Sequence, residues 1–526
     1  MKINMKHSSV ELNDLPDEIL MIILKKLCNV EVLYSLKGVN KRLNAIAHDP
    51  IFTNRLTLMR RVSDHRTHPL PDAILDRCCL QILPEIHHKI KWLNLESSSM
   101  ERILHATNYP NLYGLGLYDI EIKIALSLFI DKNQILALVI NRTTYGKVSS
   151  EDMNSRILAH IFTTFSNLQY LNFYASSILY YGLSFIDPYP SINSSTLLEL
   201  HIRLMSFSGC LYILDGRFNK LHTLHVDVTN IFPSDFRNNN QEKFPIPNIR
   251  CFSLYCEDII NVYDELIVPY LQRMSNLEKL TLNLATYVKN TFVDGNELNQ
   301  NIVSYMPRLR IFEFYICSNH YRPKQIYLPS KEYIQHTFRD FKNDQVSSYI
   351  DYFQEEQFSL CHIYSYPYNL KYYYTITNNF PSGLFKYVQE VSLYDERSFE
   401  HEFFLRIQKS FPFIKILSIK NSKPQNHKLC RESKNDNQDV SIIQYPYLIN
   451  LTLYDAHDDY IEEFLVDTNI CLPDNCVHIN IDYEQLERVT HNFRRDSTRI
   501  NCAKLDSLCL NGRRLPEYAK DYFPHV

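Results

Sequence analysis

Glycine is scarce in this chain, and its scarcity excludes a large class of enzymes. The sequence has 10 glycines in 526 residues and a single tryptophan, whereas glycine makes up about 7% of an average protein. Gly114-Leu115-Gly116 is the nearest approach to a glycine-rich loop, and neither a third glycine nor a Lys-Ser/Thr pair follows it. A dinucleotide-binding fingerprint and a P-loop are both missing, which argues against a nucleotide-dependent enzyme.

Signals of secretion and of membrane insertion are also missing. The 13 cysteines include no C-x-x-C pair, and an odd, scattered set is typical of reduced thiols inside the cell. Residues 1–10 lack the apolar core of a signal peptide, and no run of 18 apolar residues occurs. The net charge of −4 at pH 7 provides no basic excess for nucleic acid. We expect an intracellular protein, in the cytoplasm, the nucleus or both, that binds neither membrane nor nucleic acid.

The histidines and cysteines show no spacing typical of a catalytic or metal site. His222 and His225 are too close for a helical zinc pair, and on a predicted strand their side chains face opposite sides. No Gly-x-Ser-x-Gly elbow and no catalytic-thiol motif occurs. We therefore expect no catalytic residue, no metal and no cofactor. A hydrolase or metalloenzyme built on the repeats described below stays an alternative, which metal analysis of purified protein would test.

Residues 10–56 are predicted to form a small helical domain. Leu15-Pro16-Asp17-Glu18 is a helix start, because proline suits the first helical turn and acids favour the positive end of the helix dipole. Apolar residues then recur with helical spacing from Ile19 to Leu27, and two further short helices end near Phe52. Three helices of this size form a marginal core, so the domain either caps the following residues or offers apolar surface to a partner.

This segment resembles the F-box motif, through Leu15-Pro-x-Glu-Ile-Leu20-x-x-Ile23-x-x-x-Leu27, then Leu33, Leu36 and Val39-Asn-Lys-Arg-Leu43. Phe52 stands where many members have tryptophan. The resemblance implies docking to a Skp-type adaptor and, through it, to a cullin scaffold. It also implies that the following residues carry adaptor contacts or the motif's core: Leu15, Pro16, Ile19, Leu20, Ile23, Leu33, Leu36 and Val39.

From residue 90 onward, a short pattern of apolar-x-x-apolar-x-apolar recurs. Ile90-Lys-Trp-Leu93-Asn-Leu95 is its first copy, and the copies follow one another at intervals of 22 to 34 residues outside a gap between 319 and 386. Helix-compatible stretches lie between them, and repeats of this length resemble irregular leucine-rich repeats. We predict an α/β fold in which the F-box precedes a right-handed parallel β/α solenoid.

The expected domains follow from these patterns. They are an F-box at 10–56, a helical linker or cap at 57–89, leucine-rich-repeat-like solenoid at 90–319, degenerate repeats or an insertion at 320–385, and further solenoid at 386–526. Within the tyrosine-rich segment 320–385, we expect a helix over Lys331–Tyr352.

The residue that follows each repeat pattern is predicted to face the concave side of the solenoid, because side chains alternate along a strand. Six of the 13 residues at this position are tyrosine, where composition would give about one. High strand propensity explains part of this excess, and a binding surface is the second interpretation, since tyrosine is common at interfaces. The candidate target-binding residues are Tyr118, Tyr174, Arg203, His225, Asp227, Tyr255, Tyr315, Tyr394 and Tyr454.

The sequence as a whole indicates a non-catalytic substrate receptor of an SCF-type ubiquitin ligase, which binds an unidentified protein target through the solenoid. The alternative is a repeat scaffold that has no connection with ubiquitin. We expect Tyr255→Ala or Tyr315→Ala to weaken target binding more than it lowers thermal stability.

Overall fold

The structure is a computed structural model that divides into two compact units, Met1–Thr229 and Asn230–Val526. It describes residues 15–61, 67–118, 134–141, 151–174, 182–183, 192–233, 246, 248–288, 291–321, 329–339, 341, 345–427, 442–466, 470–474 and 477–526. Within these residues, no helix is both long enough and apolar enough to span a bilayer.

The first unit begins with the predicted helices. They are α1 (Asp17–Leu24), α2 (Asn29–Leu36), α3 (Lys41–Ala47) and the single turn α4 (Pro50–Thr53). Asn40 and Asp49 cap α3 and α4, because their side-chain oxygens accept the amide hydrogens of Leu43 and Ile51, each at 2.8 Å. The side chain of Phe52 is fully buried, so it takes part in the core of this domain.

The linker after the helices contains a strand that the sequence patterns do not predict. β1 (Arg55–Thr57) pairs in parallel with the first repeat strand, β4 (Trp92–Glu96). The segment between them holds the short hairpin β2 (Arg60–Arg61) and β3 (Thr67–His68), then α5 (Asp72–Arg77), the π-helical turn η2 (Cys78–Ile82) and α6 (Leu83–Ile86). This segment thus contains helical turns and also extends the sheet by one strand.

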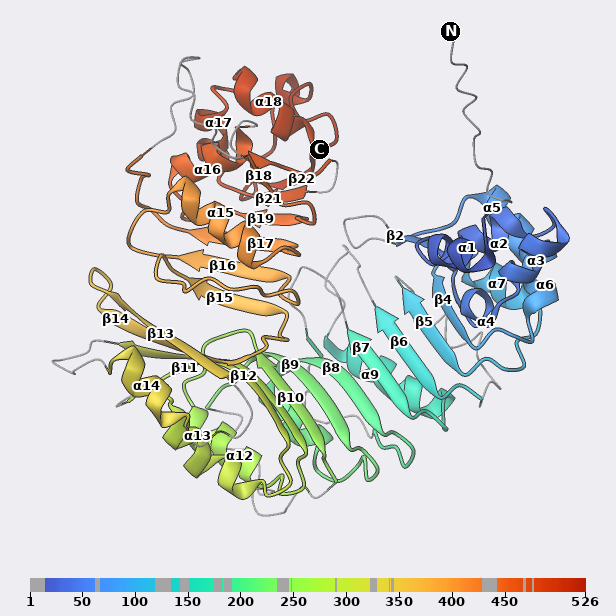
Figure 1. Cartoon of the computed structure of the whole chain (residues 1–526), viewed down its shortest axis with the longest axis horizontal. Coiled ribbons are helices and arrows are strands. Elements are labelled where there is room, and N and C mark those ends of the chain that lie inside the picture. Colours follow the sequence, from blue (N-terminus) through green and yellow to red (C-terminus); the bar gives the residue numbers. More distant parts are fainter. Residues whose placement is uncertain are drawn as a thin grey trace, which may run out of the picture. The chain divides into compact units, whose positions relative to one another are not determined.

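The repeat pattern forms a ladder of parallel strands in the first unit (Figure 1). After β4 come β5 (Gly114–Tyr118), β6 (Ala137–Asn141), β7 (Tyr170–Tyr174), β8 (Glu199–Ser206) and β9 (Thr223–Asn230). The second apolar positions of the copies pair with one another in the row Leu93, Leu115, Leu138, Leu171 and Leu200. The predicted parallel strands are therefore confirmed here, and the register pairs equivalent positions of neighbouring copies.

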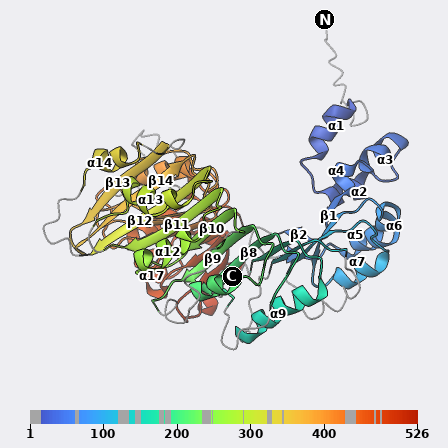
Figure 2. The ribbon, with the colours of Figure 1, turned by 90° about the horizontal axis from the view of Figure 1, so that it is seen from below.

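Figure 2 shows α7 (Met100–Ala106) and α9 (Glu151–Thr164) along one face of this sheet. The short helix α10 (Phe207–Ile213) directly follows β8. The leucines of the paired row are fully or almost fully buried, because each strand turns alternate side chains toward the helices. The strand-then-helix repeat confirms the predicted leucine-rich-repeat-like α/β solenoid.

The second unit contains two sheets. The first continues the repeat pattern in β10 (Cys251–Cys256), β11 (Lys279–Tyr287) and β12 (Ile311–Tyr321), which pair in parallel, and then ends in the antiparallel strands β14 (Phe358–Tyr366) and β13 (Gln345–Phe353). The helical turns η3 (Tyr263–Ile267), α12 (Val268–Gln272), α13 (Gly295–Asn301), η4 (Val303–Tyr305) and α14 (Lys331–Thr337) connect these strands.

The hairpin of β13 and β14 corrects the prediction of a helix over Lys331–Tyr352. The helix ends at Thr337, and residues from Gln345 onward are strand. Tyr349 and Phe353 are buried and lie four residues apart on β13, so their side chains share one face of the hairpin.

The second sheet returns to the parallel ladder. Its strands are β15 (Tyr372–Ile376), β16 (Glu390–Tyr394), β17 (Ile416–Lys420), β19 (Asn450–Thr452), β21 (Val477–Asn480) and β22 (Leu505–Cys509). The accompanying elements are α15 (His401–Ser410), α16 (Asp458–Leu465), α17 (Tyr483–Val489), α18 (Asp496–Ala503), η5 (Glu517–Ala519) and the short pair β18 (Ile443–Gln444) and β20 (Ile470–Cys471). One continuous apolar core joins the hairpin to this sheet.

Candidate functional site

The start of α1 is held in place by one arginine of α3. Arg42 donates from Nη2 to the carbonyl oxygen of Leu15 at 2.5 Å and from Nε to Oδ1 of Asp17 at 2.7 Å. Its guanidinium thus pairs with the carbonyl oxygen just before α1 and with a carboxylate of the first turn, a position where acids are favoured. The orientation of α1 is therefore set by a contact with α3.

The eight sequence-predicted adaptor residues divide into two groups. Leu20, Leu33 and Leu36 are buried and form the core of the helical domain, while Leu15 is half-buried. Pro16 is exposed, and so are Ile19 at 43%, Ile23 at 42% and Val39 at 59%. The four exposed residues are available to a partner, and the buried leucines form the core that supports them.

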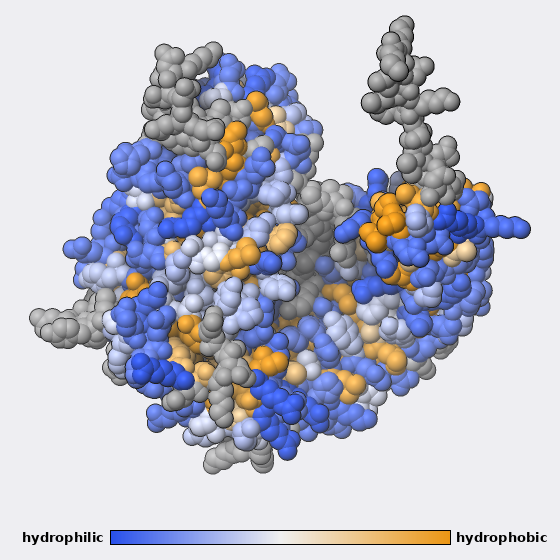
Figure 3. Space-filling model, in the orientation of Figure 1, coloured by the Kyte–Doolittle hydropathy of each residue, from blue (hydrophilic) through white to orange (hydrophobic). Residues whose placement is uncertain are grey.

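Two further exposed apolar residues, one on α1 and one shortly after it, were not among the predicted ones. Ile22 is 58% exposed and Leu27 is 48% exposed. Ile22 lies next to Ile23, and Leu27 lies three residues after the end of α1. We call the group of Ile19, Ile22, Ile23, Leu27 and Val39 the apolar helix surface. Figure 3 shows hydrophobic side chains gathered on the helical part of the first unit, and grouped apolar side chains of this kind mark interaction sites.

In the first unit, the residues predicted to face the concave side lie on strands or at strand ends. Tyr118 ends β5, Arg203 lies on β8, and His225 and Asp227 lie on β9; all four are half-buried. Tyr174 ends β7, and its side chain lies outside the described part of the structure.

In the second unit, two of the predicted tyrosines are buried. Tyr255 is 7% exposed and stacks on Tyr372 with ring centroids 4.2 Å apart. Tyr315 is 1% exposed; its hydroxyl donates to the carbonyl oxygen of Tyr374 at 2.7 Å and lies 3.0 Å from Nδ1 of His362. Burial lowers the pKa of His362 to about 3, so the imidazole is neutral at physiological pH.

The expectation that Tyr315→Ala or Tyr255→Ala acts mainly on binding is accordingly corrected. Both rings pack against strands or loops of the tyrosine-rich segment, whose position the repeat pattern does not predict. Removing a buried aromatic side chain costs about 3–5 kcal/mol of folding free energy. These two tyrosines therefore act first on stability.

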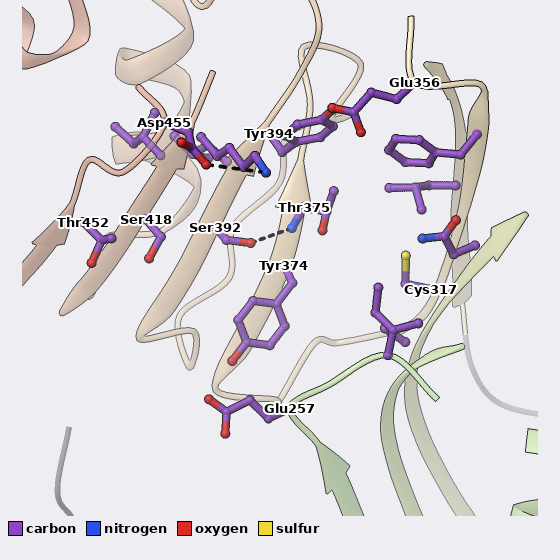
Figure 4. A pocket seen from close by; sticks show the side chains of 18 of the residues that line it. Glu257, Cys317, Glu356, Tyr374, Thr375, Ser392, Tyr394, Ser418, Thr452 and Asp455 are labelled. Atoms are coloured by element: carbon purple, nitrogen blue, oxygen red, sulfur yellow. Dashed lines mark hydrogen bonds and ion pairs between the residues drawn. The ribbon is translucent and has the colours of Figure 1, made fainter. Parts of the chain in front are cut away.

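Tyr394 and Tyr454 line a cavity of about 550 Å³ in the second unit, and the buried Tyr315 is also part of its lining. One wall carries the polar side chains of the second sheet, and the opposite wall carries Cys317 of β12 (Figure 4). Phe358 and Leu360 of β14 line the same cavity. The polar wall consists of Thr375, Ser392, Ser418 and Thr452. These four residues come from consecutive strands or strand ends, so the ladder itself builds the wall.

Charged groups lie around this cavity. Lys420 and Asp455 form an exposed ion pair, with Nζ and Oδ2 3.7 Å apart. Burial of Tyr394 and its hydrogen bond to the carboxylate of Glu356 raise the pKa of the tyrosine hydroxyl. Glu257 lies at the mouth (Figure 4). Three carboxylates against one lysine make the lining acidic.

A group of ligand-type side chains lies on β8 and β9 of the first unit. Oε1 of Glu199 lies 2.6 Å from Nε2 of His201, and the ring of His201 stacks on that of His225 with centroids 4.2 Å apart. One ligand atom from each of the three residues lies within 4.8 Å of the others. Sequence spacing within one strand missed this group, because its histidines come from different repeats.

Several buried thiols are poorly suited to act as nucleophiles. Burial raises the pKa of Cys78, Cys256 and Cys361 to about 12, whereas a reactive cysteine needs a lowered pKa. These three cysteines therefore behave as small core residues.

The helical domain matches a known family. The family model described as F-box-like matches residues 12–59. No curated protein matches the chain. Among solved structures, the crystal structure of the Rad7 and Elc1 complex in yeast is similar, with 11% identity, coverage of 78% of this chain and 94% of that chain, and a TM-score of 0.26. The chain thus carries an F-box-like domain at residues 12–59, followed by a leucine-rich-repeat-like α/β solenoid.

Proposed function

We propose that this protein is the substrate-receptor subunit of an SCF-type ubiquitin ligase. The observation that carries the proposal is the apolar helix surface on an F-box-like domain. Fully burying one aliphatic side chain of this size is favourable by about 1.5–3 kcal/mol. Five such side chains on α1 and the segments after α1 and α2 give a Skp-type adaptor a surface of useful affinity, and a cullin scaffold would join through that adaptor.

The solenoid would bind the target protein. Support comes from the cavity of about 550 Å³ beside Tyr394 and Tyr454, which combines apolar and polar walls, as ligand sites usually do. In this proposal ubiquitin transfer is performed by the partners. The chain acts inside the cell by raising the effective concentration of the target near the conjugating enzyme.

The adaptor contact can be tested by capture of a purified Skp-type adaptor on the full-length protein. We expect the double variant Ile19→Glu, Ile23→Glu to lose capture, because two carboxylates would be buried without partners at the interface. Both side chains are more than 40% exposed, so the variant should keep the thermal unfolding midpoint of the wild type.

Leu80→Glu is the matched control. Leu80 is 76% exposed and lies in η2, on the same unit but outside the apolar helix surface. It should capture adaptor as the wild type does. Failure of the wild type to bind adaptor would overturn the proposal and favour a scaffold without a ubiquitin connection.

A further inference from the structure

The repeat ladder places two histidines and a glutamate together on the first unit. His201 is the central residue of Leu200-His-Ile202 on β8, and His225 is the central residue of Leu224-His-Val226 on β9. Equivalent positions of neighbouring repeats lie side by side in a parallel sheet, which explains the stacked rings. Glu199 precedes His201 by two residues and therefore lies on the same face of the strand.

We propose that Glu199, His201 and His225 bind a divalent transition-metal cation, with Zn²⁺ the best fit. Two imidazole nitrogens and one carboxylate oxygen form a ligand set that suits zinc, and three protein ligands leave a fourth position open. The proposal is independent of the ubiquitin-ligase function, since it involves neither the apolar helix surface nor the cavity of the second unit.

The present distances are compatible with closure around an ion. The three ligand atoms lie within 4.8 Å of one another, and in a tetrahedral zinc site they would lie about 3.3 Å apart. Closure would also break the stacking of the two rings, because parallel imidazoles direct their in-plane lone pairs side by side and not at one ion. Glu199 already lies 2.6 Å from Nε2 of His201, so metal binding would replace that hydrogen bond with two bonds to the cation.

The surroundings allow an ion to enter. All three side chains are half-buried, so solvent reaches them. Arg203 and Asp227 occupy the next positions on the same face of β8 and β9. Their opposite charges cancel, so the carboxylate of Glu199 supplies the net negative charge that offsets the cation. The fourth coordination position would then accept water or a side chain from a bound partner.

The test is isothermal titration of the purified full-length protein with Zn²⁺, after treatment with chelator. We expect the double variant His201→Ala, His225→Ala to bind one Zn²⁺ fewer per chain than the wild type. Glu199→Gln should weaken the same site by about tenfold or more, because the amide carries no charge. Co²⁺ bound at this site should show the visible absorption of tetrahedral coordination in the wild type and lose it in the double variant.

His222→Ala is the matched control, because His222 adjoins the same strand but bonds through Nδ1 with the hydroxyl of Thr223, 2.9 Å away. It should retain the full zinc stoichiometry. The proposal is overturned if the double variant and the wild type bind equal amounts of Zn²⁺, or if the wild type binds none. An unchanged circular dichroism spectrum of Glu199→Gln separates loss of the site from loss of the fold.

Discussion

At the scale of single residues, burial decides what the polar groups do. Tyr315 and His362 have side chains that could serve a binding site, yet both are enclosed by the aromatic core of the second unit. Burial has its clearest effect on the carboxyl group of Glu297, in α13. Burial, reinforced by the carboxylate of Asp264, raises its pKa to about 7, and its Oε1 has no hydrogen-bond partner.

Glu297 makes stability depend on pH. Its pKa is higher in the folded chain, at about 7, than its ordinary value of 4.5, so the folded state binds the proton more tightly. Stability therefore falls as pH rises from 4.5 to 7 and stays reduced above 7. We expect Glu297→Gln to raise the thermal midpoint at pH 8 by about 2 °C and to leave it unchanged at pH 4.5. Equal midpoints of variant and wild type at pH 8, measured by calorimetry, would contradict this.

At the scale of elements, the hairpin of β13 and β14 is tied to the second sheet by a buried carboxylate. Asp351 of β13 accepts hydrogen bonds from the hydroxyl of Thr377 at 2.9 Å and from Nδ2 of Asn379 at 2.7 Å. Thr377 directly follows β15, and Asn379 comes two residues later. These two bonds connect the end of one sheet with the start of the next.

We expect Asp351→Ala to lower the free energy of unfolding by about 1–3 kcal/mol, because the buried hydroxyl of Thr377 would lose its acceptor. Glu355→Ala is the comparison. Its exposed ion pair with Lys423, at 2.6 Å, also links the hairpin turn to the second sheet, but exposed pairs contribute only about 0–1 kcal/mol. Denaturant unfolding of both variants at pH 7 measures the difference, and equal losses would argue against the buried carboxylate as the main link.

The elements also show what the sequence can predict. The parallel strands were predictable because each carries the same two buried apolar positions, as in Leu417 of β17 and Leu451 of β19, which pair directly. The hairpin of β13 and β14 was not predictable, because its strands lack that pattern and because its tyrosines are compatible with either a helix or a strand. The burial of Tyr315 followed from the hairpin, so the pattern could not reveal it. The pairing of His201 with His225 was detectable, since both are central residues of consecutive repeats.

At the scale of the molecule, the helical domain is joined to the repeats by backbone hydrogen bonds. The carbonyl oxygen of Asn54 accepts the amide hydrogens of Lys91 and Trp92, each at 2.9 Å, just before β1 pairs with β4. On the other side, Nδ2 of Asn29 in α2 donates to the carbonyl oxygen of Arg55 at 2.8 Å. Within the first unit, the helical domain is thus connected to the first repeat strands by hydrogen bonds and not by a flexible linker.

Insertion of two glycines between Thr53 and Asn54 should disturb this junction. We expect faster amide hydrogen exchange in β1 and β4, because the inserted residues shift Asn54 and Arg55 from their partners, while adaptor capture in the proposed complex stays intact. The same insertion after Gly216, in an exposed turn of the same unit, should leave exchange in β1 and β4 unchanged. Mass spectrometry of the two insertion variants checks this, and slow exchange in both would contradict the role of the junction.

The direct entry of β1 into the sheet has a consequence for the distance over which the proposed receptor acts. A flexible tether would let a bound target sample a large volume, and its local concentration would fall as the tether lengthened. Here the chain passes from the docking helices to the first repeats through fixed hydrogen bonds. For a target held on the first repeats, the fixed distance between these repeats and the docking helices would determine which target lysines the ligase can reach.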